Sequence, residues 1–320
     1  IEIPFITIAV LIFLVVAVFI ILKSLKSIGP TEIGLVNKRF SISKLSDDNP
    51  IAFNGEAGYQ EVLLMPGLRF KLWPIFHIIK YPWVQVPAGE IGVVIAQVGK
   101  PLPIGAKSAV YKSEFANFSR VKDFIIKGGQ KGVQRPVLSP GSLVPIHPVG
   151  FLVITKKQVY GLPVAPEIRD LAAKRNGVLT PEAFGLKPAQ LDVVYIEPQH
   201  DQNGKVKDVV GIVTVNDGDP LSSGDIASRL GAFDDISKLE SSSSVSDLAL
   251  METILGNKNS LHNNYQDFQA FIDNGGRIGL QHDPLLYGMY NLNPFLVNVE
   301  IAPMLVIEQG EVAVIKSYVG

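Results

Sequence analysis

The stretch that decides the fold is PAGEIGVVIAQVGKPL at residues 87–102. Shorter or more diverged copies read PTEIGLV at 30–36, VVGIVTVNDGDPL at 209–221 and QGEVAVIKSYVG at 309–320. The copy at 209–221 keeps the glycine, the second glycine seven residues later and the Pro-Leu pair. Internal repeats mark repeated structural units, so these copies indicate how the chain is divided.

A second motif recurs in step with the first. It reads FIIKGGQKGVQ and then PVLSPG within 124–141, and FIDNGGRIGLQ and then PLLYG within 271–288. A shorter version, GYQEVLLMPG, covers 58–67. Because two motifs recur in the same order, the sequence predicts three units in tandem and the beginning of a fourth.

Each unit is expected to consist mainly of β-strands. Glu90 to Val98 is rich in β-branched residues and is bounded by Pro-Ala-Gly and by Gly99, which predicts a strand. Pro-Gly pairs at 66–67 and 140–141 suit type II turns, in which Gly takes a positive φ. The predicted fold class is α+β and β-dominated, with tandem small β modules that carry helical insertions.

The N-terminal residues predict a transmembrane helix. Ile3 to Leu22 contains no charged residue, and twenty residues at about 1.5 Å each span a hydrocarbon core of roughly 30 Å. A secretory signal peptide is the alternative, although the apolar run is long and no small-x-small cleavage site follows it. The expected membrane anchor residues are Ile3, Phe5, Leu11, Phe13, Leu14, Phe19 and Leu22.

Two basic residues after this helix predict its orientation. Lys23 and Lys26 follow the span, whereas only Glu2 precedes it. The positive-inside rule therefore places the soluble units in the cytoplasm.

The repeats give predicted domain boundaries. The helix and its flank occupy 1–26, and the three units occupy 27–86, 87–206 and 207–306. Residues 307–320 are expected to begin a further unit, so we expect the native chain to continue.

Insertions interrupt the second and third predicted units. Glu167–Gly177, with Pro166 before it, predicts a short helix, and Thr180 is expected to begin a helical turn. In the third unit, Asp225–Leu230 and Leu248–Leu255 have apolar residues at helical spacing.

A turn signal lies between the second and third units. Gln202-Asn203-Gly204-Lys205 is predicted to join strands at 193–196 and 209–213 as a hairpin. A run of four serines at 241–244 is expected to be a flexible link in the third insertion.

Aromatic residues are concentrated at 69–86, in the first unit. Trp73 and Trp83 are candidates for a membrane-interface belt, because this unit follows the helix directly. The alternative is that both rings fill a small β core.

These motifs resemble the SPFH or band-7 superfamily, which includes stomatins, prohibitins, flotillins and bacterial relatives. The matching pieces are the helix, Pro30–Val36, LMPGLRFKLWP at 64–74, Glu90–Gly99 and LSPG at 138–141. The tandem arrangement is similar to a bacterial flotillin-like protein with several units, and the stacking is also similar to major vault protein. Most members instead have one such domain followed by a long helical segment, which here would lie beyond Gly320.

The resemblance implies a scaffold in the bacterial inner membrane. Many copies would lie side by side in a large homo- or hetero-oligomer, as a ring or cage that encircles a patch of lipid bilayer. Membrane-protein clients such as a membrane protease are the implied partners. From the residues themselves, the open edges of β modules held in one orientation favour such contacts.

Composition and motifs argue against several other classes of function. The formal charge of −1 and the lack of a basic stripe exclude a nucleic-acid footprint, so no nucleic-acid partner is expected. The chain contains no Cys, and its five histidines show no metal-ligand spacing. It also lacks a phosphate-binding loop and a nucleophile elbow, so we predict no catalytic residue, cofactor or metal.

Two acidic features have structural interpretations beside functional ones. Glu32, Glu90 and Glu311 share one position of the repeat, and solvated turn edges or intersubunit pairs explain them better than a repeated catalytic acid. Asp217-Gly218-Asp219 resembles the start of a cation loop but aligns with Val98-Gly99-Lys100, which makes it a turn.

Two hypotheses from different classes therefore stand. The first is a membrane-anchored scaffold that encloses a membrane microdomain and organises lipids or clients. The second is a membrane-tethered enzyme or ligand-binding domain with its site in the insertions 164–206 and 222–270. The scaffold is favoured because the repeated features are structural and not reactive.

Overall fold

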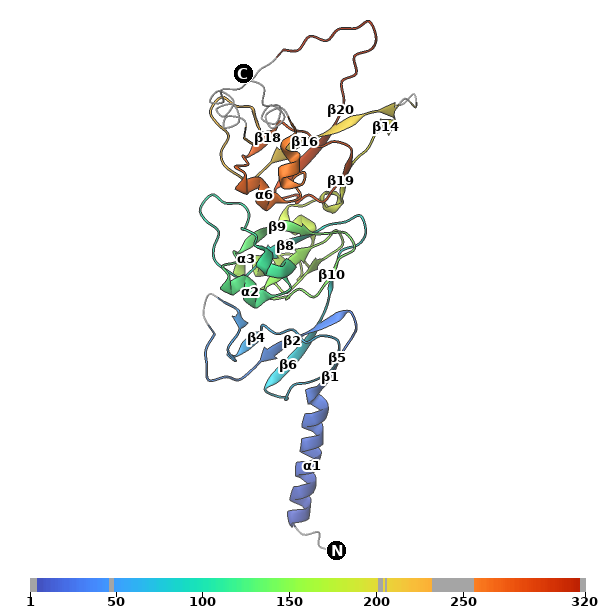
Figure 1. Cartoon of the computed structure of the whole chain (residues 1–320). Coiled ribbons are helices and arrows are strands. Elements are labelled where there is room, and N and C mark those ends of the chain that lie inside the picture. Colours follow the sequence, from blue (N-terminus) through green and yellow to red (C-terminus); the bar gives the residue numbers. More distant parts are fainter. Residues whose placement is uncertain (1–4, 46–48, 201–203, 205, 232–255, 317–320) are drawn as a thin grey trace.

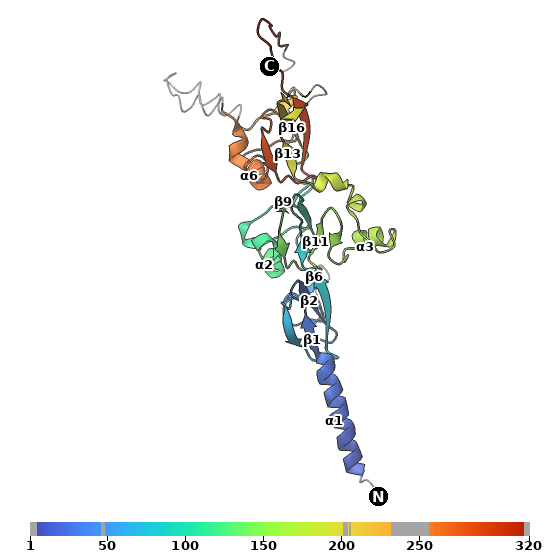
Figure 2. The ribbon, with the colours of Figure 1, turned by 90° about the vertical axis from the view of Figure 1, so that its right-hand side faces the viewer.

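The computed structural model describes residues 5–45, 49–200, 204, 206–231 and 256–316. The protein is mixed α+β, and residues in strands outnumber those in helices, as the sequence predicts. Figure 1 shows three β-rich units in line above a long N-terminal helix, and Figure 2 shows the same stack from the side.

The N-terminal helix α1 (Phe5–Ser24) stands away from the β units. Most of its described side chains are exposed, including the predicted anchor residues Leu11, Phe13, Leu14, Phe19 and Leu22. Within the described ranges, it is the one helix long and apolar enough to cross a membrane, a test that a signal sequence also passes. Phe5 begins the helix, whereas Ile3 lies outside the described residues.

The first unit contains a four-stranded sheet and a two-stranded ribbon. The sheet has the order β3-β4-β2-β6, and the ribbon pairs β1 with β5. These strands are β1 (Leu25–Ile28), β2 (Glu32–Lys38), β3 (Ile51–Ala52), β4 (Gly58–Gln60), β5 (Gly67–Phe70) and β6 (Phe76–Pro82).

The second unit repeats this plan and adds helices. Its sheet has the order β12-β11-β8-β9, and its ribbon pairs β7 with β10. The strands are β7 (Val84–Gln85), β8 (Gly92–Ala96), β9 (Gly132–Leu138), β10 (Leu143–Val144), β11 (Phe151–Ile154) and β12 (Val159–Tyr160). The helices are η1 (Ser113–Phe118), α2 (Val121–Ile126), α3 (Pro166–Ala173), η2 (Pro181–Phe184) and η3 (Pro188–Leu191).

The third unit follows the same plan. Its sheet has the order β17-β18-β16-β20, and its ribbon pairs β13 with β19. The strands of the sheet and ribbon are β13 (Val194–Ile196), β16 (Val209–Val215), β17 (Ala227–Ser228), β18 (Gly279–Gln281), β19 (Gly288–Tyr290) and β20 (Val297–Pro303). A small hairpin of β14 (Gln199–His200) and β15 (Val206–Lys207) and the helices η4 (Lys258–His262) and α6 (Phe268–Asp273) complete it.

The glycine of the first motif has the same packing role in all three units. Gly34, Gly92 and Gly211 lie in the central strands β2, β8 and β16. A Cβ at these positions would lie 3.1, 3.2 and 3.3 Å from the Cβ of Leu64, Leu138 and Leu285, respectively. Each leucine belongs to the second motif, so the two motifs recur together because they pack against each other.

The second and third units also share an unusual backbone turn before the short helix. Ala116, Asn117 and Phe118 have φ values of 45°, 50° and 63°. Asn263, Asn264 and Tyr265 have φ values of 46°, 54° and 63°. Since few non-Gly residues adopt positive φ, three in succession at equivalent positions identify η1–α2 and η4–α6 as copies of one element.

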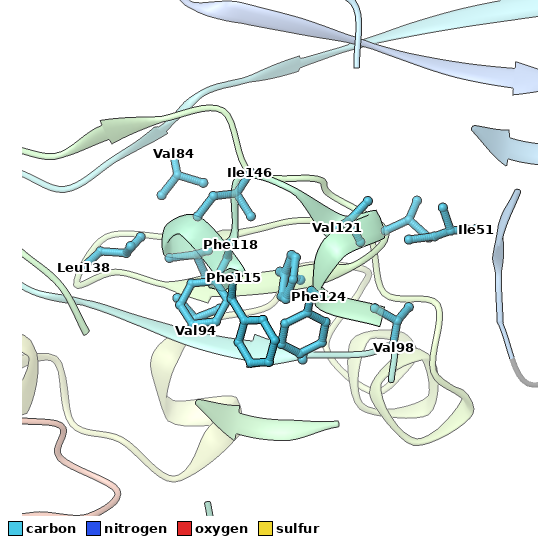
Figure 3. Packing of buried hydrophobic residues seen from close by; sticks show 14 of the residues in the cluster. Ile51, Val84, Val94, Val98, Phe115, Phe118, Val121, Phe124, Leu138 and Ile146 are labelled. Carbon is cyan, nitrogen blue, oxygen red and sulfur yellow. The ribbon is translucent and has the colours of Figure 1, made fainter. Parts of the chain in front are cut away.

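The sheet of the second unit is buried on both faces. Val94 and Ala96 of β8 belong to one apolar cluster, with Phe118 and Phe124, whereas Val93 and other residues of the opposite face belong to another. Figure 3 shows the first cluster, and in Figure 2 the α3 insertion lies on the side of the sheet away from α2. Because both faces of the sheet are covered, the residues of β8 are apolar throughout and do not alternate between apolar and polar.

The structure corrects two local predictions. Asp225–Leu230, predicted as a helix, contains strand β17, which pairs in parallel with β18. The strands predicted at 193–196 and 209–213 do not pair with each other, because β13 pairs with β19 and β16 pairs with β18 and β20. Residues 202, 203 and 205 of the predicted turn lie outside the described residues. The strands on either side of that segment that pair with each other are β14 and β15.

Other predicted elements are found where expected. The helix after Pro166 is α3, and the turn after Thr180 is η2, which is a 3₁₀ helix. Pro140-Gly141 forms the predicted turn, with a positive φ at Gly141 and a bond from the Ser142 N–H to the Ser139 carbonyl oxygen at 3.2 Å. Gly67 also has a positive φ, but it is the first residue of strand β5 and is not part of a turn. The predicted helix Leu248–Leu255 and the serines at 241–244 lie outside the described residues.

Strand pairing also bears on the limits of the units. β13 lies within 87–206, the range predicted for the second unit, yet it pairs with β19 in the third.

Residues 304–316, which follow β20, contain no strand and are exposed. Val312, Val314 and Ile315 are 93%, 94% and 89% exposed.

Candidate interaction surfaces

The end of α1 is fixed to the first unit by hydrogen bonds and by ring packing. Ser24, the last helical residue, accepts bonds from the N–H groups of Trp73 at Oγ (2.9 Å) and of Lys71 at its carbonyl oxygen (3.0 Å). The Trp73 ring lies edge-on to Phe19 of the helix, with 5.6 Å between ring centroids. The helix and the β units therefore form one continuous body at this point.

The two tryptophans predicted for a membrane interface have different surroundings. Trp73 lies against the helix, next to the ribbon that carries the exposed side chains of Leu68 and Phe70. Trp83 lies between β6 and β7, where its indole N–H donates to the Glu32 carbonyl oxygen at 3.0 Å. The structure thus places Trp73, but not Trp83, in contact with the helix.

The predicted topology residues flank the same point. Lys23 is in the last turn of α1, with Nζ 5.7 Å from the centre of the Phe19 ring. Lys26 is exposed on β1. Both cations therefore lie at the end of the apolar helix, next to the first unit.

The recurring acids occupy unlike environments. Glu32 accepts a hydrogen bond from the Gly29 N–H and lies 3.5 Å from Lys80 Nζ, and the Gly29 bond lowers the pKa of Glu32. Oε2 of Glu90 is buried without a hydrogen-bond partner among the described residues. Glu311 is exposed in the C-terminal segment. The three carboxylates therefore share a sequence position but not one chemical role.

The junction between the first and second units combines an ion pair with apolar packing. Lys122 Nζ of α2 lies 3.1 Å from Glu61 Oε1, which follows β4. Ile51 of β3 is fully buried in the cluster that includes Val121, and Figure 3 shows these two side chains close together. Residues from both units thus form one core.

His147 provides a polar link across this junction. Its Nδ1 accepts bonds from the N–H groups of Val149 and Gly150, so Nε2 carries the proton and donates to the Gln60 carbonyl oxygen at 3.1 Å. His147 is fully buried, and burial lowers its pKa to about 4. The imidazole is therefore neutral at physiological pH.

The junction between the second and third units has the same geometry with different side chains. Arg135 of β9 donates from Nη1 to Oε1 of Gln269 on α6 at 2.5 Å. Nδ2 of Asn293 donates to the Gln134 carbonyl oxygen at 2.9 Å, as His147 does at the first junction. Asn293 also accepts a bond at Oδ1 from the N–H two residues later, so it is an amide counterpart of His147.

The acidic turn of the third unit belongs to this junction. Asp217 accepts bonds from the Ser108 hydroxyl and, at 3.3 Å, from the Lys107 N–H. Gly218 has a φ of 142°, and a Cβ there would lie 2.5 Å from the Gly276 carbonyl oxygen. The segment predicted to be a turn and not a cation loop is therefore a close-packed turn whose acid bonds the preceding unit.

A glutamine side chain closes the same turn in every unit. Nε2 of Gln60, Gln134 and Gln281 donates to the carbonyl oxygens of the residues two and four positions earlier, at 2.9–3.0 Å. Sequence reasoning did not assign this role, although the signal is present as Gly-Tyr-Gln, Gly-Val-Gln and Gly-Leu-Gln in the three copies. The glutamine positions align the three units residue by residue.

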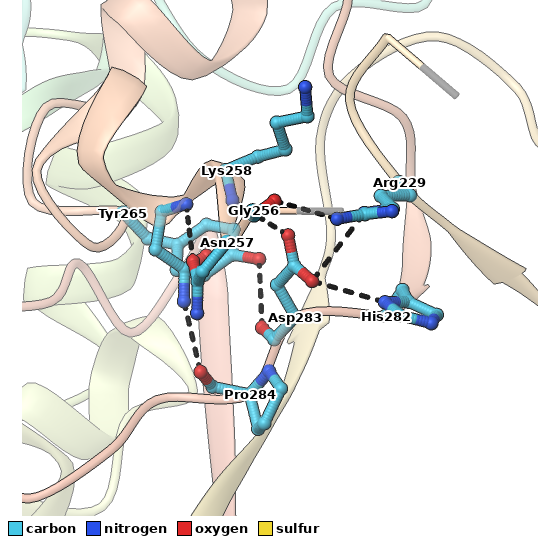
Figure 4. Close-up of polar contacts among 9 residues, drawn as sticks. Arg229, Gly256, Asn257, Lys258, Tyr265, His282, Asp283 and Pro284 are labelled. Atoms are coloured by element: carbon cyan, nitrogen blue, oxygen red, sulfur yellow. Dashed lines mark hydrogen bonds and ion pairs between the residues drawn. The ribbon is translucent and has the colours of Figure 1, made fainter. Parts of the chain in front are cut away.

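The third unit carries a polar cluster around Asp283, directly after β18, and Figure 4 shows it. Asp283 accepts a bond from the Lys258 N–H at 2.9 Å and pairs with His282 (3.1 Å) and Arg229 (3.6 Å). Burial alone would raise the pKa of Asp283, but these partners lower it on balance. Arg229 also donates to the Gly256 carbonyl oxygen at 2.7 Å, which links the residue after β17 to the segment before η4.

A hollow next to this cluster adjoins the second predicted insertion. Its lining includes Asp225, Arg229, Arg277 and His282. Within the described ranges, no group of three or more His, Asp or Glu side chains is arranged to hold a metal ion. The five histidines are dispersed, and His262, like His147, is buried, with its pKa lowered by burial to about 4.

Comparisons with known proteins give no relative. No protein-family model matches the chain, and neither the curated proteins nor the solved structures contain a significant match.

Proposed function

We propose that this protein is a membrane-anchored scaffold whose copies assemble side by side into a large ring or cage on a lipid bilayer. The observation that carries the proposal is the direct connection of an apolar helix, most of whose described side chains are exposed, to a stack of three repeated β units. The hydrogen bonds at Ser24 couple the orientation of the stack to that of the helix. Copies in one membrane would therefore stand parallel, in the arrangement that lateral assembly needs.

Open sheet edges supply surfaces for that assembly. β6 and β20 occupy the same position in the first and third units, and each is a seven-residue strand at the outer edge of its sheet. In the second unit the equivalent strand β11 is covered by β12. Unpaired edges invite pairing with another chain, so these two strands are the expected lateral contacts between neighbours.

The repeat motifs support the more specific proposal of SPFH-like modules in a flotillin-like protein. On that proposal the helix spans a bacterial inner membrane, with the β units in the cytoplasm. The assembly would organise lipids or enclose membrane-protein clients such as a membrane protease. The supporting features are the GEIGVV and LSPG motifs and the small strand-rich units that contain them.

The size of the native particle tests the proposal. The full-length protein would be extracted in a mild detergent, and its mass would be measured by light scattering after gel filtration. We expect a particle of megadalton size, and a variant that lacks residues 5–24 is the control, because it loses the parallel orientation. A monomer or small oligomer would contradict the scaffold and favour the membrane-tethered enzyme or ligand-binding domain.

A further inference from the structure

The two junctions use equivalent positions, and in the third unit no following unit covers these positions among the described residues. The residue after the recurring glutamine (Gln60, Gln134 or Gln281) is Glu61 in the first unit, Arg135 in the second and His282 in the third. Glu61 meets Lys122 and Arg135 meets Gln269. Lys122 and Gln269 are both the second residue of the short helix in the next unit, α2 or α6.

The exposed fraction of the side chain distinguishes His282 from Glu61 and Arg135. The Glu61 side chain is 17% exposed, and Arg135 is 7% exposed. The His282 side chain, in contrast, is 63% exposed. His282 borders the hollow described above, together with Ala227 of β17, whose counterpart Ser108 is buried at the second junction.

The carbonyl groups of the glutamines show the same difference. The Gln60 carbonyl oxygen accepts a bond from His147 and that of Gln134 accepts one from Asn293. In the part of the chain that the structure describes, no side chain of a later unit reaches the Gln281 carbonyl oxygen.

The segment beyond β20 carries the opening motif of a unit. Residues 310–315 read GEVAVI, which matches the start of the central strand in the other units. With Glu311 aligned to Glu32 and Glu90, the counterparts of Val312 and Val314 are Ile33 and Leu35 in the first unit and Ile91 and Val93 in the second. These four side chains are at most 1% exposed, whereas Val312 and Val314 are more than 90% exposed. In the third unit the counterpart of Val314 is Ile212, which is 37% exposed. This strand sequence therefore has no sheet to enter among the described residues.

We infer that the end of the third unit around Ala227, Gln281 and His282 is a docking face for a fourth β module, whose first strand is formed by residues 311–316. The module would present the second residue of a short helix to His282 and a capping His or Asn side chain to the Gln281 carbonyl. The inference rests on the repeated junctions and does not depend on the scaffold proposal.

A second copy of the chain does not fit this face. Docking requires a helix at the position of α2 or α6, and the first unit has no helix between β3 and β4. The two helices of this type among the described residues already contact the first and second units through Lys122 and Gln269. The fitting occupant is therefore a further module of the same chain.

Cysteine labelling tests the inference, because the 320 residues contain no cysteine. His282→Cys would be introduced into the natural full-length protein in its own membranes and reacted with N-ethylmaleimide. Ile104→Cys, at a fully exposed position, and Glu61→Cys, at the covered equivalent, are the controls, with the unaltered protein as background. We expect His282→Cys to react about tenfold or more slower than Ile104→Cys, since a covered thiol reacts only during local opening.

Two outcomes would overturn the inference. If His282→Cys reacts as fast as Ile104→Cys in the native membrane, no module covers the face around His282. If protection is present in the membrane but is lost under detergent conditions in which light scattering shows only single chains, a separate molecule covers the face. Protection that persists in the single chain supports a fourth module in the same polypeptide.

Discussion

The two junctions of the stack share a backbone plan but differ in side-chain chemistry. The first uses the Glu61–Lys122 ion pair and His147, whereas the second uses Arg135 with Gln269 and the amide of Asn293. At each junction, one contact is made by the residue that follows the recurring glutamine, which is Gln60 or Gln134. Another contact is made to the carbonyl oxygen of that glutamine. The comparison indicates that the two junctions share the backbone positions of their contacts and not the identity of the polar partners.

The largest loss in the free energy of unfolding is expected at Gly99, where the tight turn leaves no space for a Cβ atom. Gly99→Ala would place a Cβ 2.3 Å from the Gly129 carbonyl oxygen at a φ of 107°, so we expect a loss of about 4 kcal/mol or more in the free energy of unfolding. Gly105→Ala has a similar φ of 91° but open space around it, and should cost about 1–2 kcal/mol. Chemical denaturation of both variants measures the difference, and equal losses would contradict a packing role for Gly99.

The next largest effect is expected from the core shared by the first and second units. Ile51→Ala removes a fully buried side chain from that core and should cost about 3 kcal/mol. Hydrogen exchange should then increase on both sides of the junction, in β4 and in α2. Ile42→Ala, at a fully exposed position, is the matched control. An increase confined to the first unit would show that the two units do not share one core.

Acid should weaken the first junction more than the second. The pKa of His147 is lowered to about 4, below its ordinary value near 6.5, so between these values the unfolded chain binds more protons than the folded chain. Stability is therefore fully present above pH 6.5 and falls as the pH drops towards 4, by at most about 1.4 kcal/mol per pH unit.

The variant His147→Asn copies the second junction and should remove this part of the pH dependence. His262 remains as a second buried histidine with a lowered pKa, so some acid sensitivity should persist. Thermal unfolding of both proteins from pH 7 to pH 4.5 checks the prediction. An unchanged pH profile in His147→Asn would refute a role for this imidazole.

The smallest effect is expected from the ion pair of the first junction. The Lys122 side chain is 45% exposed, so Glu61→Gln should cost less than about 1 kcal/mol and should reduce the dependence of stability on salt. The double variant Glu61→Arg with Lys122→Gln transfers the second junction's pair to the first and should restore most of the loss. A loss in the double variant as large as that of Ile51→Ala would show that the pairs are specific.

The sequence predicted the elements that depend on local patterns. The apolar run became α1, the repeated GEIGVV and VGIVTV segments became β8 and β16, and the residues after Pro166 became α3. Glycine and Pro-Gly turns were recognisable because their backbone conformations restrict the residue type. The tandem units were visible because two motifs recur in a fixed order.

Features that depend on distant residues were not predictable in the same way. Asp225–Leu230 has helical spacing, but pairing with β18 makes part of it a strand. The equivalence of His147 and Asn293 has no signal in residue type, since both act by donating to a backbone carbonyl group. The contact of Trp73 with the helix likewise depends on the fold of the first unit, which returns β5 to the helix end.

Electron microscopy of the full-length protein in its own membrane, extracted as native nanodiscs, tests the scaffold most directly. The account predicts closed rings or domes in which parallel stacks stand on a disc of bilayer and meet through the edges at β6 and β20. Isolated, randomly spaced single stacks at native density would contradict it.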